Sequence, residues 1–171
     1  TWSWKGGGSA PLLKRVPHAA ATVVSAHHTD PLFQESLPDY DLFCEGDVPL
    51  LFTENETNHE RLFGSPNASP YVKDAFDNYI VHGLEDVVNP LGVGTRCAAH
   101  YSLTVEPGQT ATVRLRLRRA SPSAVAHPFA EFDSLFAQRI READEFYRGV
   151  LPPSVQADPD RARVMRHALA G

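Results

Sequence analysis

Carboxylates, amides and a guanidinium crowd one segment of the sequence. After the apolar residues 50–52, residues 53–61 read TENETNHER and show no apolar period. Glycoside hydrolysis requires two carboxyl groups, one that protonates the departing oxygen and one that attacks the sugar or activates water. The carboxylates in or near this segment that have the required type are Glu54, Glu56, Glu60, Asp74 and Asp77.

The same kinds of side chain also bind sugars without catalysing a reaction, because carboxylates, amides and guanidinium groups each offer two hydrogen-bonding atoms to a pair of hydroxyls. The candidates for such a substrate pocket are Glu54, Asn55, Glu56, Asn58, Arg61, Lys73 and Asp74. The competing interpretation is a loop bonded to itself, in which Asn58, Asn67 and Asn89 cap turns and Arg61 pairs with Glu54 or Asp74.

Other site chemistries have little support in the residue pattern. The glycines of residues 92–95 lead into a strand pattern rather than from a strand into a helix, which disfavours dinucleotide binding. His59 and Glu60 lack the second histidine of a zinc helix. Cys44 and Cys97 have no metal-ligand spacing, and two cysteines are no disulfide framework, so we expect free thiols. We therefore expect no metal and no cofactor.

Short strands separated by turns surround the polar segment. Residues 21–24 and 40–44 are apolar, strand-like runs, and Trp2 and Trp4 alternate with polar neighbours. The clearest pattern is a hairpin: apolar and polar residues alternate over 101–105 and 113–118, with a turn at residues 106–109. This alternation predicts a buried apolar face and a solvated face that carries Arg114, Arg116 and Arg118.

Helical spacing replaces the strand pattern after residue 119. Phe132, Phe136 and Ile140 belong to an apolar stripe of a helix over about residues 129–149, which is expected to pack on the sheet or on a missing domain. Pro152 and Pro153 end it. Asp158 caps a second helix that has Pro159 at its first position.

Charge and hydropathy narrow the class of protein. The formal net charge is −5, and the clustered arginines alternate along a strand, so we expect no nucleic-acid partner. No apolar run approaches the about 20 residues that span a bilayer. We expect a soluble chain without a membrane partner, with the cytoplasm preferred as its location.

Four stretches together resemble a known family: FTENETNHERLFG, NASPYVKDAF, VNPLGVGTRCAAHY and READEFY. They are similar to sequences of bacterial glycosidases of glycoside hydrolase family 63, the mannosyl-oligosaccharide glucosidase relatives. In that family an N-terminal β-sandwich precedes an (α/α)6 barrel, and the barrel carries the catalytic acid and base. The resemblance covers residues from about 41 to 171.

The resemblance implies a mainly β fold: an antiparallel β-sandwich over residues 1–119, incomplete at its N-terminus, and a helical linker over 120–171 that leads towards an absent barrel. The chain is then a piece of a longer enzyme, and its ends, TWSW and ALAG, fall within a strand and a helix pattern. It holds no catalytic residue of its own and shapes the pocket for a carbohydrate substrate of the full-length α-glucosidase-like enzyme. The alternative function is a stand-alone carbohydrate-binding module.

Overall fold

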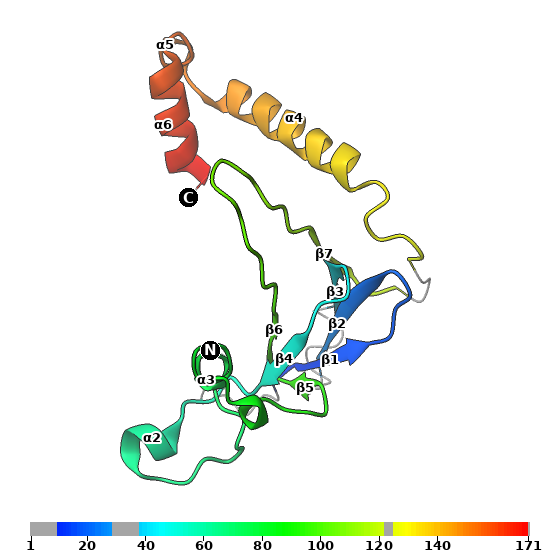
Figure 1. The fold of residues 1–171 in the computed structure, drawn as a ribbon. Helices are drawn as coiled ribbons and strands as arrows, with labels where there is room; N and C mark the ends of the chain where they lie inside the picture. The colour runs from blue at the N-terminus through cyan, green and yellow to red at the C-terminus, as the bar shows by residue number, and fades with distance from the viewer. Residues whose placement is uncertain (1–9, 29–37, 122–124, 171) are drawn as a thin grey trace. The chain divides into compact units, whose positions relative to one another are not determined.

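The fold is an antiparallel sheet protein followed by helices, as seen in a computed structural model that describes residues 10–28, 38–121 and 125–170 (Figure 1). The chain divides into two compact units, residues 1–129 and 130–171. Among the described residues, the strands and the polar loop lie in the first unit, and three helices lie in the second. The predicted strand at Trp2 and Trp4 lies outside the described residues.

Five strands form the larger sheet in the order β5-β1-β2-β3-β7, and each neighbouring pair is antiparallel. Their bounds are β1 Leu12–Val16, β2 Ala21–His27, β3 Tyr40–Glu45, β5 Val93–Gly94 and β7 Leu115–Arg119. β2 and β3 confirm the strands predicted at residues 21–24 and 40–44. The smaller sheet pairs β4 Leu50–Thr53 with β6 Arg96–Ala99.

The core lies at the centre of the larger sheet, where both faces are covered. Val23 and Phe43 are opposite each other on one face, and the His18 ring packs edge-on against Phe43 at 5.5 Å between centroids. Val24 and Cys44 are buried on the other face. The sheets are antiparallel, as predicted. Both are open in the described residues and the smaller one has two strands, so the sandwich arrangement itself stays a prediction.

A close approach of backbones joins the two sheets at Gly94. A Cβ atom at this position would lie 2.5 Å from the carbonyl oxygen of Thr53. Only glycine fits there, and Thr53 is completely buried. This contact holds the end of β4, and therefore the start of the polar loop, against the edge strand β5.

The hairpin predicted over residues 101–118 is wrong in two respects. Its turn forms, since the Gln109 N–H donates to the Glu106 carbonyl at 2.9 Å, but the limbs are not paired and β7 pairs with β3 instead. The faces are also inverted: Leu115 and Leu117 are 47% and 67% exposed. We call residues 101–113, which are extended and belong to no strand, the arm; it connects β6 to the segment that leads into β7 (Figure 1).

The arginines of this segment have partners on the protein, which explains the inversion. Arg114 forms an ion pair with Glu45 at 3.3 Å, and Arg116 donates to the carbonyl of Pro128 at 2.8 Å. Pro128 is completely buried. The arginine side of β7 therefore faces the protein, and its leucine side faces outwards.

The second unit consists of α4 Phe132–Val150, α5 Pro153–Gln156 and α6 Pro159–Ala170. α4 ends before Pro152, and the Asp158 carboxylate accepts from the backbone N–H groups of Asp160 and Arg161, so both predicted helix signals are confirmed. Phe136 and Ile140 of the predicted apolar stripe are exposed, and its packing on a missing domain stays a prediction.

Candidate functional site

The polar loop occupies residues 54–92 between β4 and β5. It contains the helices α2 His59–Phe63 and α3 Ala75–His82 and the 3-10 turn η1 Glu85–Val87. Two backbone bonds return it to the end of β4: the Glu54 N–H donates to the Tyr71 carbonyl at 2.8 Å, and the Asn89 N–H donates to the Phe52 carbonyl at 2.9 Å. The loop is therefore anchored to the sheet at several points along its length.

Asn58 is the centre of the loop's hydrogen bonds. Its Oδ1 caps α2 by accepting from the backbone N–H of Arg61 at 3.0 Å, and it also accepts from Asn67 Nδ2 at 3.0 Å. Its Nδ2 donates to both carboxylate oxygens of Asp74, at 3.2 and 3.1 Å. One carboxamide thus joins the start of α2, the turn at Asn67 and the residue before α3.

Arg61 completes this cluster, because its guanidinium pairs with Asp74 at 3.0 Å. Of the seven predicted pocket residues, Asn58, Arg61 and Asp74 are brought together, but they bind one another. The interpretation of a loop bonded to itself is confirmed for these three, including the alternative in which Arg61 pairs with Asp74. Asn89 also caps a turn, since its Oδ1 accepts from the Leu91 N–H at 3.0 Å.

The other four predicted pocket residues are not part of the Asn58 cluster. Thr95 donates its hydroxyl proton to Glu54 at 2.7 Å and accepts from the Asn55 N–H at 2.8 Å. The Lys73 N–H donates to the Glu56 carbonyl at 2.9 Å. Within the described residues the side chains of Asn55, Glu56 and Lys73 have no hydrogen-bond partner, so they remain pocket candidates by prediction.

Arg96 holds the second half of the loop. Its guanidinium donates to the Lys73 carbonyl at 2.7 Å and lies over the Phe76 ring, 4.8 Å from the ring centroid. A cation over an aromatic face is attracted by the ring's quadrupole. α3 is therefore fixed to β6 by a residue that contacts both the backbone before the helix and a side chain on it.

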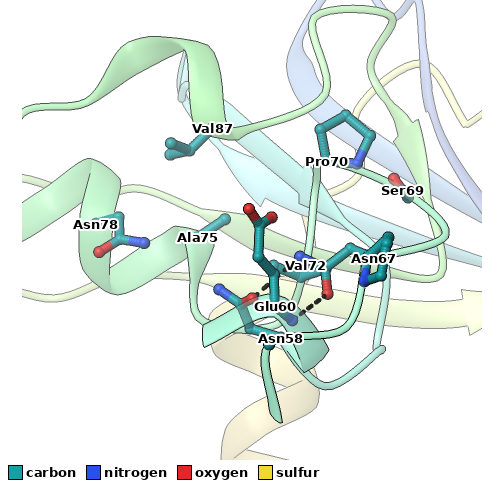
Figure 2. Close-up of a pocket in the computed structure, with 11 residues that line it drawn as sticks. Asn58, Glu60, Asn67, Ser69, Pro70, Val72, Ala75, Asn78 and Val87 are labelled. Carbon is teal, nitrogen blue, oxygen red and sulfur yellow. Dashed lines mark hydrogen bonds between the residues drawn. The ribbon is translucent and has the colours of Figure 1, made fainter. Parts of the chain in front are cut away.

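A cavity of about 540 Å³ opens between these braced elements (Figure 2). Its apolar wall includes the buried residues Val72 and Ala75. Figure 2 shows the Glu60 carboxylate directed into the cavity from α2, with Asn78 on α3 nearby. The residues that line the cavity are Asn58, Glu60, Gly64, Pro66, Asn67, Ser69, Pro70, Val72, Ala75, Asn78 and Val87.

Glu60 and Asn78 differ from the other polar residues of the cavity. The side chains of Asn58 and Asn67 form hydrogen bonds within the loop. Asn67 Oδ1, for example, accepts from the His59 and Glu60 N–H groups at 2.7 and 3.3 Å. Among the described residues, nothing bonds to the Glu60 carboxylate or the Asn78 carboxamide. These two groups are free to accept from, and in the case of Asn78 donate to, a ligand.

The sequence indicated Glu60 only as one carboxylate of a possible catalytic pair, and Asn78 was not among the predicted pocket residues. A signal exists for Asn78, because it follows Ala75 by three residues on α3 and so lies on the same side of the helix as that buried residue. The Asn58–Asp74 bond brings α2 and α3 to one cavity. It joins residues 16 positions apart, so no local sequence pattern indicates it.

Both cysteines are free, as predicted. Burial, with a contribution from the nearby Cys44, raises the pKa of the Cys97 thiol to about 11. Burial also raises the pKa of Cys44. In residues 10–28, 38–121 and 125–170, no three metal-ligating side chains gather at one point. Over the same residues, no helix combines the length and the apolar character needed to cross a membrane.

Comparison with known proteins gives one informative match. The chain is 33% identical over 196 residues to "Uncharacterized protein YMR196W" of Saccharomyces cerevisiae, and all of the chain takes part in the match. The chain spans 18% of the length of that relative. No protein-family model matches the chain, and no solved structure matches it. The relative's name states no activity, so the glycosidase resemblance stays a prediction.

Proposed function

We propose that this chain is a non-catalytic, N-terminal region of a larger glycoside hydrolase of the family 63 type. In this proposal the antiparallel sheets belong to a β-sandwich that packs on an (α/α)6 barrel, and the barrel supplies the catalytic acid and base. Two observations support a larger protein: the motifs that resemble the family, and a relative in which the matched region is 18% of the length.

The observation that carries the proposal is the cavity of the polar loop. A sugar ring has an apolar face of C–H groups and a rim of hydroxyls, and binding sites for such ligands combine an apolar wall with a few placed polar groups. Val72 and Ala75 provide the apolar wall, and Glu60 and Asn78 provide the free polar groups. The loop therefore contacts the substrate from the sheet side of the full-length enzyme.

The braces around Asn58 and Arg96 serve this role by fixing the cavity before a ligand arrives. A site whose side chains are already held in place loses less conformational entropy on binding. Asn58, Arg61 and Asp74 then shape the pocket indirectly. Glu54, Asn55, Glu56 and Lys73 do not line this cavity, so direct contacts of these four with a substrate stay a prediction from the sequence.

The exposed helices favour a domain of a larger enzyme over a stand-alone carbohydrate-binding module. Phe136, Ile140 and Phe146 on α4 and Val164 on α6 are exposed. A contiguous patch of such side chains would mark an interaction site. A module that works alone does not need exposed apolar side chains on its helices, whereas a linker that packs against a barrel needs them for that contact.

A titration of the pure chain with methyl α-glucoside, followed by NMR, tests the cavity. We expect millimolar binding, with chemical shift changes at Glu60, Asn78 and their neighbours. Glu60→Gln should weaken binding, whereas Glu85→Gln, on the exposed turn η1, should leave it unchanged. The same preparation should not hydrolyse aryl α-glucosides. Turnover that disappears in Glu54→Gln or Asp74→Asn would overturn the proposal of a non-catalytic region.

A further inference from the structure

The arm presents aliphatic side chains to solvent at alternate positions. Leu103 and Val105 on its first limb and Val113 on its second are exposed, and they alternate with the small polar residues Ser102, Thr104 and Thr112. Leu115 and Leu117 continue the exposed row along β7. This is the pattern of a strand that buries one face, since successive side chains point to opposite sides.

The backbone of the arm is also without partners over most of its length. Within the described residues, residues 101–113 make one backbone bond, the turn bond from the Gln109 N–H to the Glu106 carbonyl. The Arg114 carbonyl, which follows the arm, accepts from the Glu45 N–H at 3.1 Å. Gly108 has φ 75°, as the third residue of a type II turn after Pro107 requires. The turn therefore forms, but in the described residues no backbone hydrogen bonds join the two limbs on either side of it.

These two features together describe an unfinished sheet edge. Unpaired N–H and C=O groups beside exposed aliphatic side chains are a template for another strand, and proteins normally cover or disrupt such edges. Proline and lysine are the usual protection. In residues 101–113 the single charged residue is Glu106 and the single proline is Pro107, both in the turn. The limbs themselves carry no protection.

We propose that the arm is a β-augmentation site, which receives an extended segment of the same polypeptide from outside residues 1–171. The segment would form backbone hydrogen bonds with residues 102–105 or 110–113 and would place aliphatic residues at alternate positions against Leu103, Val105 and Val113. Residues 101–113 carry no basic side chain, so an acidic segment would find no ion-pair partner on the limbs, whereas an aliphatic segment matches their exposed row.

The placement of the partner in the same polypeptide rests on the proposed function and on the length of the relative, more than four fifths of which lies outside the match. A segment tethered to the same chain is present at a high effective concentration and needs no separate encounter. A second copy of this chain is the alternative occupant, and the experiment below separates the two.

Hydrogen exchange measured by mass spectrometry on the full-length protein tests the inference. We expect the amides of residues 102–105 or 110–113 to exchange at least about 100-fold more slowly than those of an unstructured chain. Thr104→Pro removes an N–H from the first limb, and Thr112→Pro does so on the second. The variant on the paired limb should abolish this protection, whereas the matched changes to Val should keep it.

Fast exchange throughout both limbs in the full-length protein would overturn the inference. Protection that disappears on dilution, together with a dimer in sedimentation, would assign the arm to a second copy and also overturn it. The readout is independent of sugar chemistry. Protection in a protein without glycosidase activity would reject the proposed function alone, and activity without protection would reject this inference alone.

Discussion

The cluster around Asn58 offers a sharp test of the braced loop, through the substitution Asn58→Asp. The new side chain has nearly the same shape, and its oxygen still accepts from the Arg61 N–H, so the cap of α2 is preserved. It has no N–H to give to Asp74, and it places a second carboxylate beside the first. The change therefore isolates the bond that joins α2 to α3.

The size of the effect follows from the loss of the hydrogen bonds between Asn58 and the Asp74 carboxylate. A hydrogen bond to a charged group contributes about 1.5–3 kcal/mol. Repulsion between the carboxylates adds to the loss, but Asp74 is partly exposed and Arg61 still neutralises it. We expect the free energy that holds the loop closed to fall by about 2 kcal/mol, which raises the population of the open loop by about 30-fold.

Limited proteolysis with trypsin measures this population, because Arg61 and Lys73 are the cleavage sites within the loop. When opening is fast relative to cleavage, the rate of cutting follows the open population. Asn55→Asp is the matched control: it adds the same charge to the same loop at a side chain without a described partner. Equal cleavage rates for Asn58→Asp and Asn55→Asp would refute the role of the Asn58–Asp74 bond.

Three further predictions concern stability. Replacing a buried Phe with Ala costs about 3–5 kcal/mol of stability, but Phe136 is 59% exposed, so Phe136→Ala should hardly change the melting temperature of this chain. A loss of stability as large as that of a core residue would contradict the exposure of Phe136. Gly94→Ala should cost about 1–3 kcal/mol in denaturant unfolding, because its Cβ would meet the Thr53 carbonyl, whereas Gly149→Ala, with open space around it on α4, should not destabilise. Burial raises the pKa of Cys97 from its ordinary value near 9 to about 11 in the folded state, so the free energy of unfolding should fall as pH rises from 9 to 11. Cys97→Ala should weaken this fall, and an unchanged slope of stability against pH would show that Cys97 does not cause it.

Local signals predicted the elements that depend on local chemistry. The β-branched residues of β2, the prolines after α4 and the Asp158–Pro159 pair before α6 each act within a few residues of where they stand. Their structural consequences were therefore visible in the sequence.

The orientation of β7 was not visible, for a physical reason. Alternation shows that a strand has two different faces, but the buried face is chosen by partners elsewhere in the chain. Arg114 and Arg116 find Glu45 and the Pro128 carbonyl, which no local pattern reveals. The cavity of the loop depends in the same way on the distant pair of Asn58 and Asp74.

The steady-state kinetics of the full-length protein on an α-glucoside test the central claim most directly, when wild type is compared with Glu60→Gln and the control Glu85→Gln. If the loop lines the substrate pocket, Glu60→Gln should lower kcat/KM by about ten-fold or more, about 1.4 kcal/mol of transition-state stabilisation, while the control stays within about two-fold of wild type. Equal kcat/KM values for the three proteins, or no α-glucosidase activity in folded wild type, would contradict the account.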